Sequence, residues 1–361
     1  MIVGIIGGGQ LGQMLAISAK KKGFDVICLD PYEKCPCSSV ADEMIISEFD
    51  NFEKIKELCE KSDVVTYEFE NIPFQIIKTL EEDFNIPQGH RPLYISQHRF
   101  REKSAANKCG LKTVTYRLVK NKEDLIDALF DLGYPCLLKT CSFGYDGKGQ
   151  KKINDDSDLS SALKLVEGTE CILEGFMDFE AEISVIAVRN INGEIAILPA
   201  PENHHVNNIL HMSVLPNTQS ELVNTLAASE VRAFIQKMDF VGIITVELFV
   251  KNNKVYFNEM APRPHNSGHY SIEGCELNQF DLALDSITNQ KVDYQDLLQP
   301  TIMVNILGQH MKKIKHFKSS DAFLHLYGKT DPKINRKMGH ITFINKTKEE
   351  VKKIMKEYLE D

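Results

Sequence analysis

Residues 142–150 read Ser-Phe-Gly-Tyr-Asp-Gly-Lys-Gly-Gln, a polar loop with three glycines. The loop lies between an apolar run at 135–139 that is typical of a buried strand and a second, lysine-rich run. Glycines can adopt positive φ and turn several backbone N–H groups toward one anion, while Lys139 and Lys148 add positive charge. The loop therefore predicts a cradle for the phosphates of a nucleoside triphosphate. On the glycines alone an ordinary hairpin is the more common outcome, because Gly and Asp-Gly mark turns in many proteins.

Composition and charge exclude several classes of protein. A chain of 361 residues with 43% hydrophobic residues is large enough for two or three domains. A net charge of −9 argues against nonspecific nucleic-acid binding and favours a small-molecule substrate. Nine scattered cysteines predict reduced thiols and a cytoplasmic location. The first residues enter a strand directly and no apolar run could span a bilayer, so we expect neither export nor membrane anchoring.

The order of apolar runs predicts an α/β and α+β protein with three units. Residues 1–95 alternate short apolar runs with helical patterns, which indicates βαβ units and a parallel sheet. A second unit, 96–290, divides into a small α+β lobe at about 96–173 and a larger, antiparallel lobe at about 174–290. Residues 291–361 are too few for an independent core and are expected to dock on the rest.

A second glycine motif follows the first strand. Residues 7–12 read Gly-Gly-Gly-Gln-Leu-Gly, and Asp30 closes the second predicted strand at the distance of a ribose-binding acid. The pattern also suits any phosphate bound at the N-terminus of a first helix. We therefore interpret it first as a site for a ribonucleotide phosphate, held at Gly9 and Gly12, and second as a nicotinamide dinucleotide site.

Two glutamates lie on adjacent strands of a predicted hairpin. Runs 246–250 and 255–259 are joined by Lys-Asn-Asn-Lys, and strand pairing brings Glu247 and Glu259 close together on one face. Two opposed carboxylates repel each other unless a cation lies between them, and Mg²⁺ prefers one or two carboxylates together with phosphate oxygens. The hairpin predicts a magnesium site for ATP. The alternative is a pair of solvated glutamates on an exposed face.

A run of polar residues follows the second glutamate. Residues 260–270 read Met-Ala-Pro-Arg-Pro-His-Asn-Ser-Gly-His-Tyr. Arg263, His265 and Asn266 offer directional donors that suit a small oxyanion such as a carboxylate or bicarbonate. A lone histidine is usually structural, but several polar types beside a metal pair indicate a site.

The order of these motifs along the chain resembles that of the ATP-grasp superfamily: the glycine motif at 7–12, the loop at 142–150, the glutamate hairpin and the polar run at 260–270. Within this superfamily, 144–150, 258–270 and 327–340 closely resemble the N5-carboxyaminoimidazole ribonucleotide synthetases of purine biosynthesis, and the resemblance extends to about residue 345. It implies a Rossmann-like, parallel-sheet pre-ATP-grasp domain, a two-lobed ATP-grasp domain and a small β-rich C-terminal domain.

The resemblance also implies roles for individual residues. Its ATP site comprises Arg99, Lys139, Gly144, Tyr145, Asp146, Gly147, Lys148, Gly149, Gln150, Glu174, Gly175, Phe176, Met177, Glu182, His205, Asn258 and Glu259. Its metal ligands, for Mg²⁺ or Mn²⁺, are Glu247 and Glu259, and its catalytic group is Arg263, His265, Asn266 and Lys148. Its acceptor site comprises Gly9, Gln10, Leu11, Glu68, Tyr145, Asp146, Lys148, Lys329, Arg336 and Lys337, of which the last three meet the phosphate. Ala261 stands where the superfamily often has Asn, which leaves a third metal ligand open, and His204 beside His205 leaves the nucleotide contact open.

The implied reaction converts ATP, bicarbonate and 5-aminoimidazole ribonucleotide, through carboxyphosphate, into the N5-carboxylated product, ADP and phosphate. The resemblance also implies that the protein is a homodimer. Other ATP-grasp ligases, such as a biotin carboxylase or an amino-acid ligase, are alternatives, although Lys329, Arg336 and Lys337 favour a phosphorylated acceptor. An NAD-dependent oxidoreductase would leave the glutamate hairpin unexplained. A catalytically silent nucleotide-binding module is a further alternative.

Overall fold

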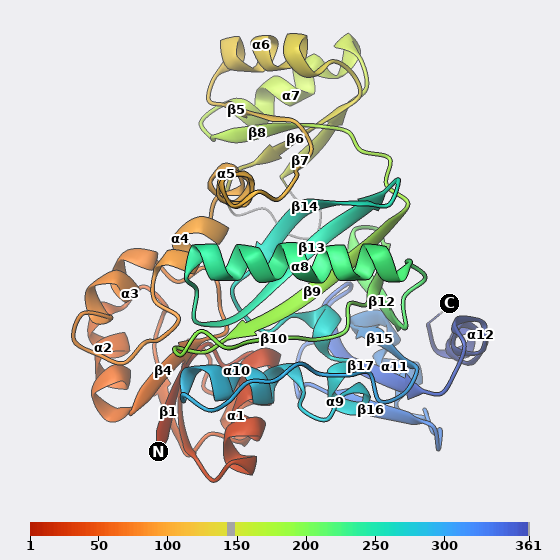
Figure 1. The fold of residues 1–361 in the computed structure, drawn as a ribbon. Helices are drawn as coiled ribbons and strands as arrows, with labels where there is room; N and C mark the ends of the chain where they lie inside the picture. The colour runs from red at the N-terminus through yellow and green to blue at the C-terminus, as the bar shows by residue number, and fades with distance from the viewer. Residues whose placement is uncertain (143–148, 360–361) are drawn as a thin grey trace.

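The N-terminal part of the chain forms a parallel sheet. The computed structural model describes residues 1–142 and 149–359, and Figure 1 shows this sheet at the base of the molecule. The strand order is β3-β2-β1-β4, and all pairs are parallel. Continuous apolar runs such as Ile2–Ile6 form these strands because both faces of the sheet are covered. The elements are β1 (Ile2–Ile6), α1 (Gln10–Lys21), β2 (Asp25–Asp30), β3 (Glu43–Ile46), α2 (Phe52–Lys61), β4 (Val64–Tyr67), α3 (Phe74–Leu80) and α4 (Arg91–Ser96).

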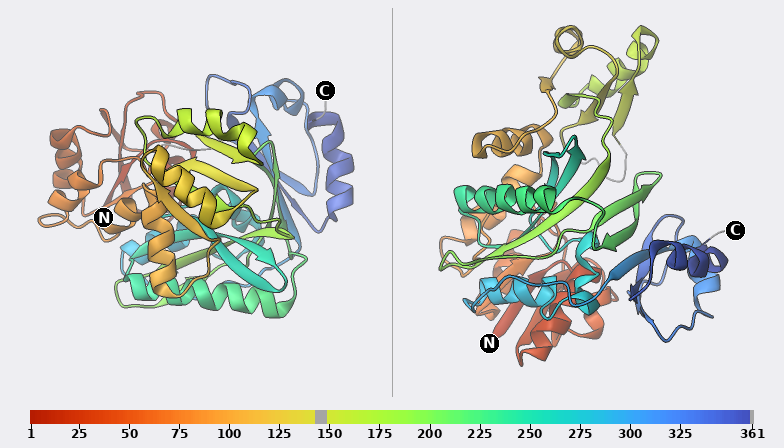
Figure 2. Two further views of the ribbon diagram at one scale, coloured as in Figure 1. Left: turned by 90° about the horizontal axis from the view of Figure 1, so that it is seen from above. Right: turned by 45° about the vertical axis from the view of Figure 1, so that its right-hand side comes forward.

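A small antiparallel lobe projects from the rest of the molecule (Figures 1 and 2). Its strand order is β5-β8-β6-β7, and its own apolar core lies under α6 and α7. Alternate residues of a strand point to opposite faces, so Leu138 and Leu173 enter this core while Lys139 and Glu174 face away from it. The elements are β5 (Tyr116–Val119), α6 (Lys122–Leu132), β6 (Cys136–Thr140), β7 (Gln150–Ile153), α7 (Leu159–Val166) and β8 (Cys171–Gly175).

The larger sheet is antiparallel and has helices on both faces. Its order is β14-β13-β9-β11-β12-β15-β17-β16, with β10 paired to β9. On β9, Val185 and Ala187 pack into the core under α8, whereas Ile186 and Val188 pack on the opposite side with residues of α1 and α10. The elements are β9 (Ala181–Arg189), β10 (Ile195–Ile197), β11 (Glu202–Val206), β12 (Ile209–Leu215), α8 (Glu221–Met238), β13 (Gly242–Lys251), β14 (Lys254–Ala261), α9 (Ser271–Gly274) and α10 (Gln279–Ile287).

The C-terminal segment continues this sheet. β15 pairs with β12 from Met212↔Val304 to Leu215↔Thr301, and β17 and β16 follow. Met212 shares an apolar core with residues of the C-terminal strands and of α12. The segment thus docks on the rest of the chain, as the sequence predicts. Its elements are β15 (Thr301–Leu307), α11 (Met311–Ile314), β16 (Ala322–Leu326), β17 (Lys337–Ile344) and α12 (Lys348–Leu359).

Helix α5 (Arg99–Cys109) lies between the two lobes. The sequence places it in the small lobe, but Ala105, Ala106 and Cys109 join the core of the larger lobe beside α8 and β14. Gly110 caps the C-terminus of the helix, and its φ of 97° favours glycine. One face of α5 is therefore fixed against the larger sheet. The predicted boundaries at 95/96, 173/174 and 290/291 stay predictions.

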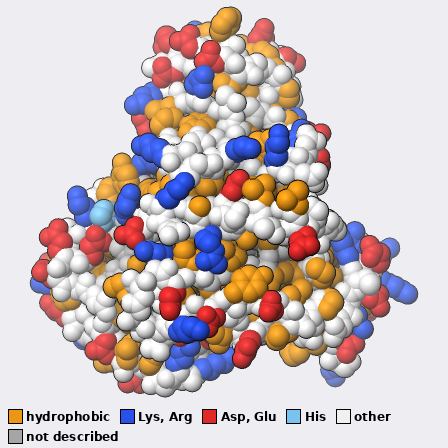
Figure 3. Space-filling view, viewed as in Figure 1, with side chains coloured by type: hydrophobic (Ala, Val, Ile, Leu, Met, Phe, Trp, Pro, Cys, Tyr) orange, Lys and Arg blue, Asp and Glu red, His pale blue; other side chains and the backbone are white. Residues whose placement is uncertain are grey.

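The surface is mixed in charge. On the face shown in Figure 3, acidic and basic side chains are interspersed. All nine cysteines fall within the described residues and are buried, unpaired thiols. Each helix in residues 1–142 and 149–359 is too short or too polar to span a membrane.

Candidate active site

A β-bulge brings the two predicted metal ligands face to face. After the two-residue turn at 252–253, β13 and β14 pair regularly as far as Leu248↔Phe257. The register then shifts, and Glu247 pairs with Glu259 instead of Asn258. Without the extra residue, Glu259 would point to the opposite face, because successive side chains of a strand alternate. The predicted proximity of the two glutamates is therefore present, and the bulge is its cause.

This pair fits a divalent cation. Burial, followed by the charges of Glu259 and Glu182, holds the pKa of Glu247 well above its ordinary value. Asn258 Oδ1 is buried and, among the described residues, has no hydrogen-bond partner. Two carboxylates and an amide oxygen are ligands that suit Mg²⁺ when phosphate oxygens complete the shell. In the described ranges, no group of three or more His, Cys, Asp or Glu side chains could hold a metal by itself.

Cations converge beside the glutamate hairpin. Arg99 Nη1 lies 2.9 Å from Glu259 Oε2, and Lys139 Nζ lies 2.9 Å from Glu174 Oε2. Lys103 Nζ lies 3.2 Å from Glu174 Oε1 and donates to Asn258 O at 3.0 Å. Despite burial, Lys103 and Lys139 lower the pKa of Glu174 to about 2. Glu174 is therefore an anion that holds two lysines next to the predicted ATP site.

Sequence reasoning missed Lys103 and its neighbour Glu102. Lys103 is 1% exposed, and Glu102 is 2% exposed and accepts a hydrogen bond from Met260 N. The spacing of Arg99 and Lys103 was the available signal, because residues four apart lie on one face of a helix.

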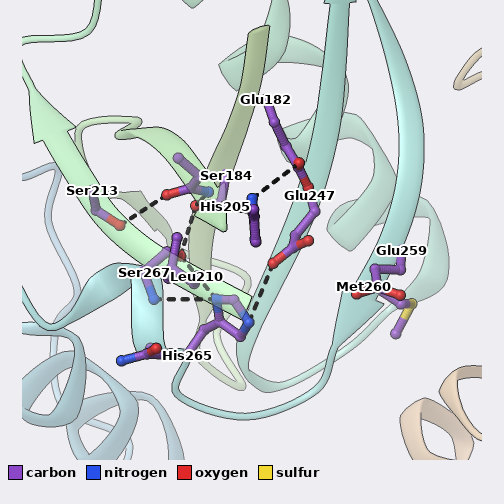
Figure 4. A network of polar contacts seen from close by, with 12 residues as sticks. Glu182, Ser184, His205, Leu210, Ser213, Glu247, Glu259, Met260, His265 and Ser267 are labelled. Atoms are coloured by element: carbon purple, nitrogen blue, oxygen red, sulfur yellow. Dashed lines mark hydrogen bonds and ion pairs between the residues drawn. The ribbon is translucent and has the colours of Figure 1, made fainter. Parts of the chain in front are cut away.

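The predicted oxyanion donors each have a partner. Arg263 Nη2 lies 2.9 Å from Glu70 Oε1, a carboxylate that sequence reasoning also missed. The amides of Asn266 and Asn305 donate to each other at 2.9 and 2.6 Å. His265 Nε2 lies 3.3 Å from Glu247 Oε1, as Figure 4 shows. A small anion that binds to Arg263, His265 and Asn266 would have to replace the present partners of these side chains.

The structure separates the two adjacent histidines. His205 Nδ1 lies 3.3 Å from Glu182 Oε2, on the side of the glutamate hairpin (Figure 4). His204 Nε2 lies 2.9 Å from Lys348 Nζ. This placement favours His205 as the nucleotide contact.

The remaining predicted nucleotide contacts lie on the small lobe or outside the described residues. Gly175 N donates to Thr115 O at 2.9 Å, and Phe176 is 45% exposed, with Lys152 Nζ 3.9 Å from its ring centroid. Met177 is half-buried beyond the end of β8. Gly149 has φ of 71° and precedes Gln150, the first residue of β7. Outside the described residues lie Gly144, Tyr145, Asp146, Gly147 and Lys148.

The loop at 7–12 is tightly built around Glu68. Gly9 N donates to Glu68 Oε1 at 2.8 Å, and Gln10 and Leu11 begin α1. A Cβ on Gly12 would lie 2.1 Å from Gly7 O, so only glycine fits there. Glu68 is 8% exposed.

Asp30 serves this loop. Its Oδ2 accepts from Gly8 N at 2.8 Å and its Oδ1 accepts from Tyr32 N at 2.9 Å. Asp30 is 6% exposed, so it supports the loop instead of presenting a carboxylate to a ribose. This arrangement counts against the nicotinamide interpretation.

The predicted phosphate cations lie near one another, and Lys329 among them lies near Glu68. Lys329 Nζ donates to Lys337 O at 2.9 Å, and Arg336 Nη1 donates to Asp331 O at 2.9 Å. Burial, followed by the charges of Arg336 and Lys337, lowers the pKa of Lys329 to about 8, although Glu68 opposes the shift. Positive charge is thus gathered where a phosphate dianion would relieve the repulsion.

We expect Glu68→Gln to flatten the pH dependence of stability. Burial raises the pKa of Glu68 from 4.5 to about 7, so the folded protein binds this proton more tightly than the unfolded chain. The free energy of unfolding therefore falls by roughly 3 kcal/mol as the pH rises from 4.5 to 7. The free energy of unfolding, measured across this range, should fall less with rising pH in the variant than in the wild type. Glu33→Gln, at an exposed position of the same domain, is the control, and identical slopes for Glu68→Gln and wild type would refute the assignment.

Comparisons with known proteins cover nearly the whole chain. Family models match at residues 1–97 (ribonucleotide synthetase preATP-grasp domain), 104–280 (ATP-grasp domain) and 301–354 (phosphoribosylaminoimidazole carboxylase C-terminal domain). The N5-carboxyaminoimidazole ribonucleotide synthase of Staphylococcus aureus (strain MRSA252) is 43% identical over 346 residues, which are 95% of this chain and 92% of the relative. The synthase of Bacillus subtilis (strain 168) is 41% identical over 352 residues, 97% and 93% of the two chains.

Solved structures show the same similarity. A crystal structure of an N5-carboxyaminoimidazole ribonucleotide synthetase as its ADP complex has a TM-score of 0.95 and 44% identity, and the match covers 98% of this chain and 95% of that one. The Aspergillus clavatus N5-carboxyaminoimidazole synthase in complex with ADP and 5-aminoimidazole ribonucleotide has a TM-score of 0.89 and 29% identity, covering 98% and 96%.

Proposed function

Because this chain belongs to the N5-carboxyaminoimidazole ribonucleotide synthase family of ATP-grasp ligases, we propose that it carboxylates 5-aminoimidazole ribonucleotide with ATP and bicarbonate. The predicted ATP-grasp architecture is confirmed by the three matching family models and by the solved structures. The products are N5-carboxyaminoimidazole ribonucleotide, ADP and phosphate, in purine biosynthesis. The observation that carries the proposal is the Glu247–Glu259 pair, held by a bulge beside Arg99 and the lysines around Glu174.

The nucleotide end of the site handles charge. Glu247 and Glu259, with Asn258 Oδ1, would hold Mg²⁺, which neutralises phosphate charge when bound. Arg99, beside Glu259, and Lys139, beside Glu174, are the proposed cations for the phosphates. Because phosphoryl transfer makes few covalent demands on the protein, catalysis consists mainly of positioning and electrostatic stabilisation.

The proposed reaction has two steps, and the amine takes the carboxyl group either from carboxyphosphate or from the CO₂ that it releases. A bicarbonate oxygen attacks the γ-phosphorus, ADP leaves and carboxyphosphate forms. The acceptor amine then takes up the carboxyl group and phosphate is released. Arg263 and Asn266 are the proposed bicarbonate donors, and Lys148 in the 144–150 loop would help to exclude the water that hydrolyses the mixed anhydride.

The acceptor end recognises a ribonucleotide. Gly9, Gln10, Leu11 and Glu68 are the proposed contacts for its ribose and phosphate, and they lie together because Gly9 N donates to Glu68 Oε1 and Gln10 begins α1. Lys329, Arg336 and Lys337 supply positive charge for the phosphate, and Tyr145 and Asp146 are proposed contacts from the loop. Charge-assisted contacts of this kind favour a phosphorylated acceptor over biotin or an amino acid.

We expect ADP formation to require both bicarbonate and 5-aminoimidazole ribonucleotide. A coupled assay with each candidate acceptor, with and without bicarbonate, measures this directly. Turnover with biotin or an amino acid would point to another ATP-grasp ligase, and saturable binding of NAD or NADPH would restore the oxidoreductase interpretation. ATP binding without turnover under every condition would indicate a silent nucleotide-binding module.

The proposal extends to assembly, location and domain limits. It includes a homodimer, a cytoplasmic location and units at 1–95, 96–290 and 291–361. Light scattering of the purified protein tests the homodimer.

A further inference from the structure

A chain of buried hydrogen bonds ends at His265, as Figure 4 shows. Ser213 Oγ donates to Asn203 Oδ1 at 2.9 Å, and Asn203 Nδ2 donates to Ser184 Oγ at 2.9 Å. Ser184 Oγ donates to Ser267 Oγ at 2.7 Å, and Ser267 Oγ lies 2.8 Å from His265 Nδ1. The three serines are 0% exposed and Asn203 is 5% exposed. We call Ser213, Asn203, Ser184 and Ser267 the serine–asparagine chain.

The register of the large sheet builds this chain. Asn203 on β11 pairs with Ser213 on β12, and Ser184 on β9 pairs with Glu247 on β13. Ser267 belongs to the short turn 266–268 that follows the polar run. Buried polar groups persist only when they are hydrogen-bonded, and a fully bonded network fixes one arrangement of its members.

The backbone N–H of Ser267 and the direction of the chain together indicate which nitrogen of His265 accepts. An amide nitrogen can only donate, so Ser184 Oγ accepts from Asn203 Nδ2. The hydroxyl hydrogen of Ser184 is then free to bond to Ser267 Oγ. The hydroxyl hydrogen of Ser267 in turn bonds to His265 Nδ1. The backbone N–H of Ser267 also donates to Nδ1, at 3.3 Å, and a backbone N–H cannot accept. Both donors therefore require an unprotonated Nδ1, which in a neutral imidazole places the proton on Nε2.

His265 Nε2 faces Glu247 Oε1 at 3.3 Å. The side chain of Gln279 fixes the backbone of His265 from both sides, because it accepts from His265 N at 2.9 Å and donates to His265 O at 2.8 Å. We propose that the serine–asparagine chain holds His265 as the Nε2–H tautomer, so that His265 donates to Glu247 and positions this carboxylate for the divalent cation of the nucleotide. The metal part of this inference rests on the proposed function.

This assignment makes His265 a positioning residue. The Nε2–H group would orient the Glu247 carboxylate through Oε1, in the way that ligands of metal ions are commonly oriented by a second hydrogen bond. A nitrogen that already carries a proton cannot accept another, so Nε2 is not the base for the acceptor amine. The amide of Asn203 also prevents the chain from relaying protons, and its role is orientation.

The tautomer is measurable without any turnover. Long-range proton–nitrogen correlation spectra of protein with ¹⁵N-labelled histidine distinguish a protonated from an unprotonated ring nitrogen, and the spectrum of His265→Gln identifies the His265 signals. We expect wild-type Nδ1 to be unprotonated and Nε2 to be protonated. A proton on Nδ1 would overturn the proposal whether or not the protein carboxylates its acceptor.

A matched pair of variants tests the chain. Ser267→Ala removes the hydroxyl donor at Nδ1, whereas Ser286→Ala removes an equally buried hydroxyl that donates to Ala283 O at 2.6 Å. With Mn²⁺ and a non-hydrolysable ATP analogue, we expect Ser267→Ala to bind Mn²⁺ about 10–100-fold more weakly, with part of the His265 population shifted to Nδ1–H, and Ser286→Ala to behave as wild type. If Ser267→Ala does not fold, Ser184→Ala is measured in its place, because it interrupts the same chain of hydrogen bonds.

The outcomes separate the two proposals. Unchanged Mn²⁺ affinity and an unchanged tautomer in Ser267→Ala, or equal losses in both variants, would overturn the role of the chain. A wild-type protein that binds no Mn²⁺ with the analogue would overturn the metal role and with it the proposed function, while the nitrogen-15 spectrum would still decide the tautomer.

Discussion

Glu247→Gln is expected to lower kcat by on the order of 10²–10³, a loss typical of removing one preorganised electrostatic group at a reacting centre. Glu247 faces Glu259 through the bulge and its Oε1 lies 3.3 Å from His265 Nε2, so the substitution removes one ligand of the proposed cation site while preserving its shape. The pKa of this carboxyl is raised in the folded protein, so its charge costs stability above its ordinary pKa. The metal-free variant should therefore unfold at the same temperature as wild type or higher.

Two measurements check this prediction. ADP formation gives kcat, and thermal unfolding with and without Mg·ATP gives the stabilisation that binding confers. Glu230→Gln is a matched control, because Glu230 lies half-buried on α8, on the other face of the sheet. If Glu247→Gln were stabilised by Mg·ATP as strongly as wild type, Glu247 would not be a metal ligand.

Arg336→Ala is expected to raise the KM for 5-aminoimidazole ribonucleotide by roughly ten- to a hundredfold. A charge-assisted contact with a phosphate is worth about 1.5–3 kcal/mol, and each 1.4 kcal/mol is about a factor of ten in affinity. Arg336 is exposed, and its charge contributes to the lowered pKa of Lys329. The KM for ATP should hardly change, because the nucleotide contacts lie on other elements.

A neighbouring lysine supplies the control for this prediction. Lys333 is exposed in the same segment and lies 3.2 Å from Asp331 Oδ2. Lys333→Ala should leave both KM values unchanged when ATP and acceptor are varied separately. Equal increases for both substrates in Arg336→Ala, with a lower unfolding temperature, would instead show that Arg336 only fixes the C-terminal segment in place.

The sequence predicted the parallel sheet and the glutamate hairpin because both leave local patterns. Continuous apolar runs mark doubly covered strands, and the Asn-Asn pair marks a tight turn. The bulge leaves only a weak mark, since it interrupts the alternation by a single residue: Asn258 and Glu259 are consecutive polar residues between Phe257 and Met260, which both join the core. The sequence alone therefore allows Glu259 to lie on either face of the hairpin.

Other parts of the site depend on contacts between distant segments. Lys103 lies in a charged helix and is buried because α5 packs on the larger sheet between the lobes. The serine–asparagine chain joins residues that are up to 83 positions apart, and serines carry no periodic signal. The predicted roles of Gly144–Lys148 lie outside the described residues and stay predictions.

The continuity of the large sheet has a consequence for how this protein is made. Strand β12 obtains its second neighbour only from β15, and the sheet is completed by β17, which ends at Ile344. Until those last strands emerge from the ribosome, β12 presents an unpaired edge of the kind that associates with other chains. Glu259 of the metal hairpin is synthesised 70 residues before Lys329, the first of the acceptor cations. We therefore expect the nascent chain to expose this edge, and its acceptor site to stay incomplete, until translation is nearly finished.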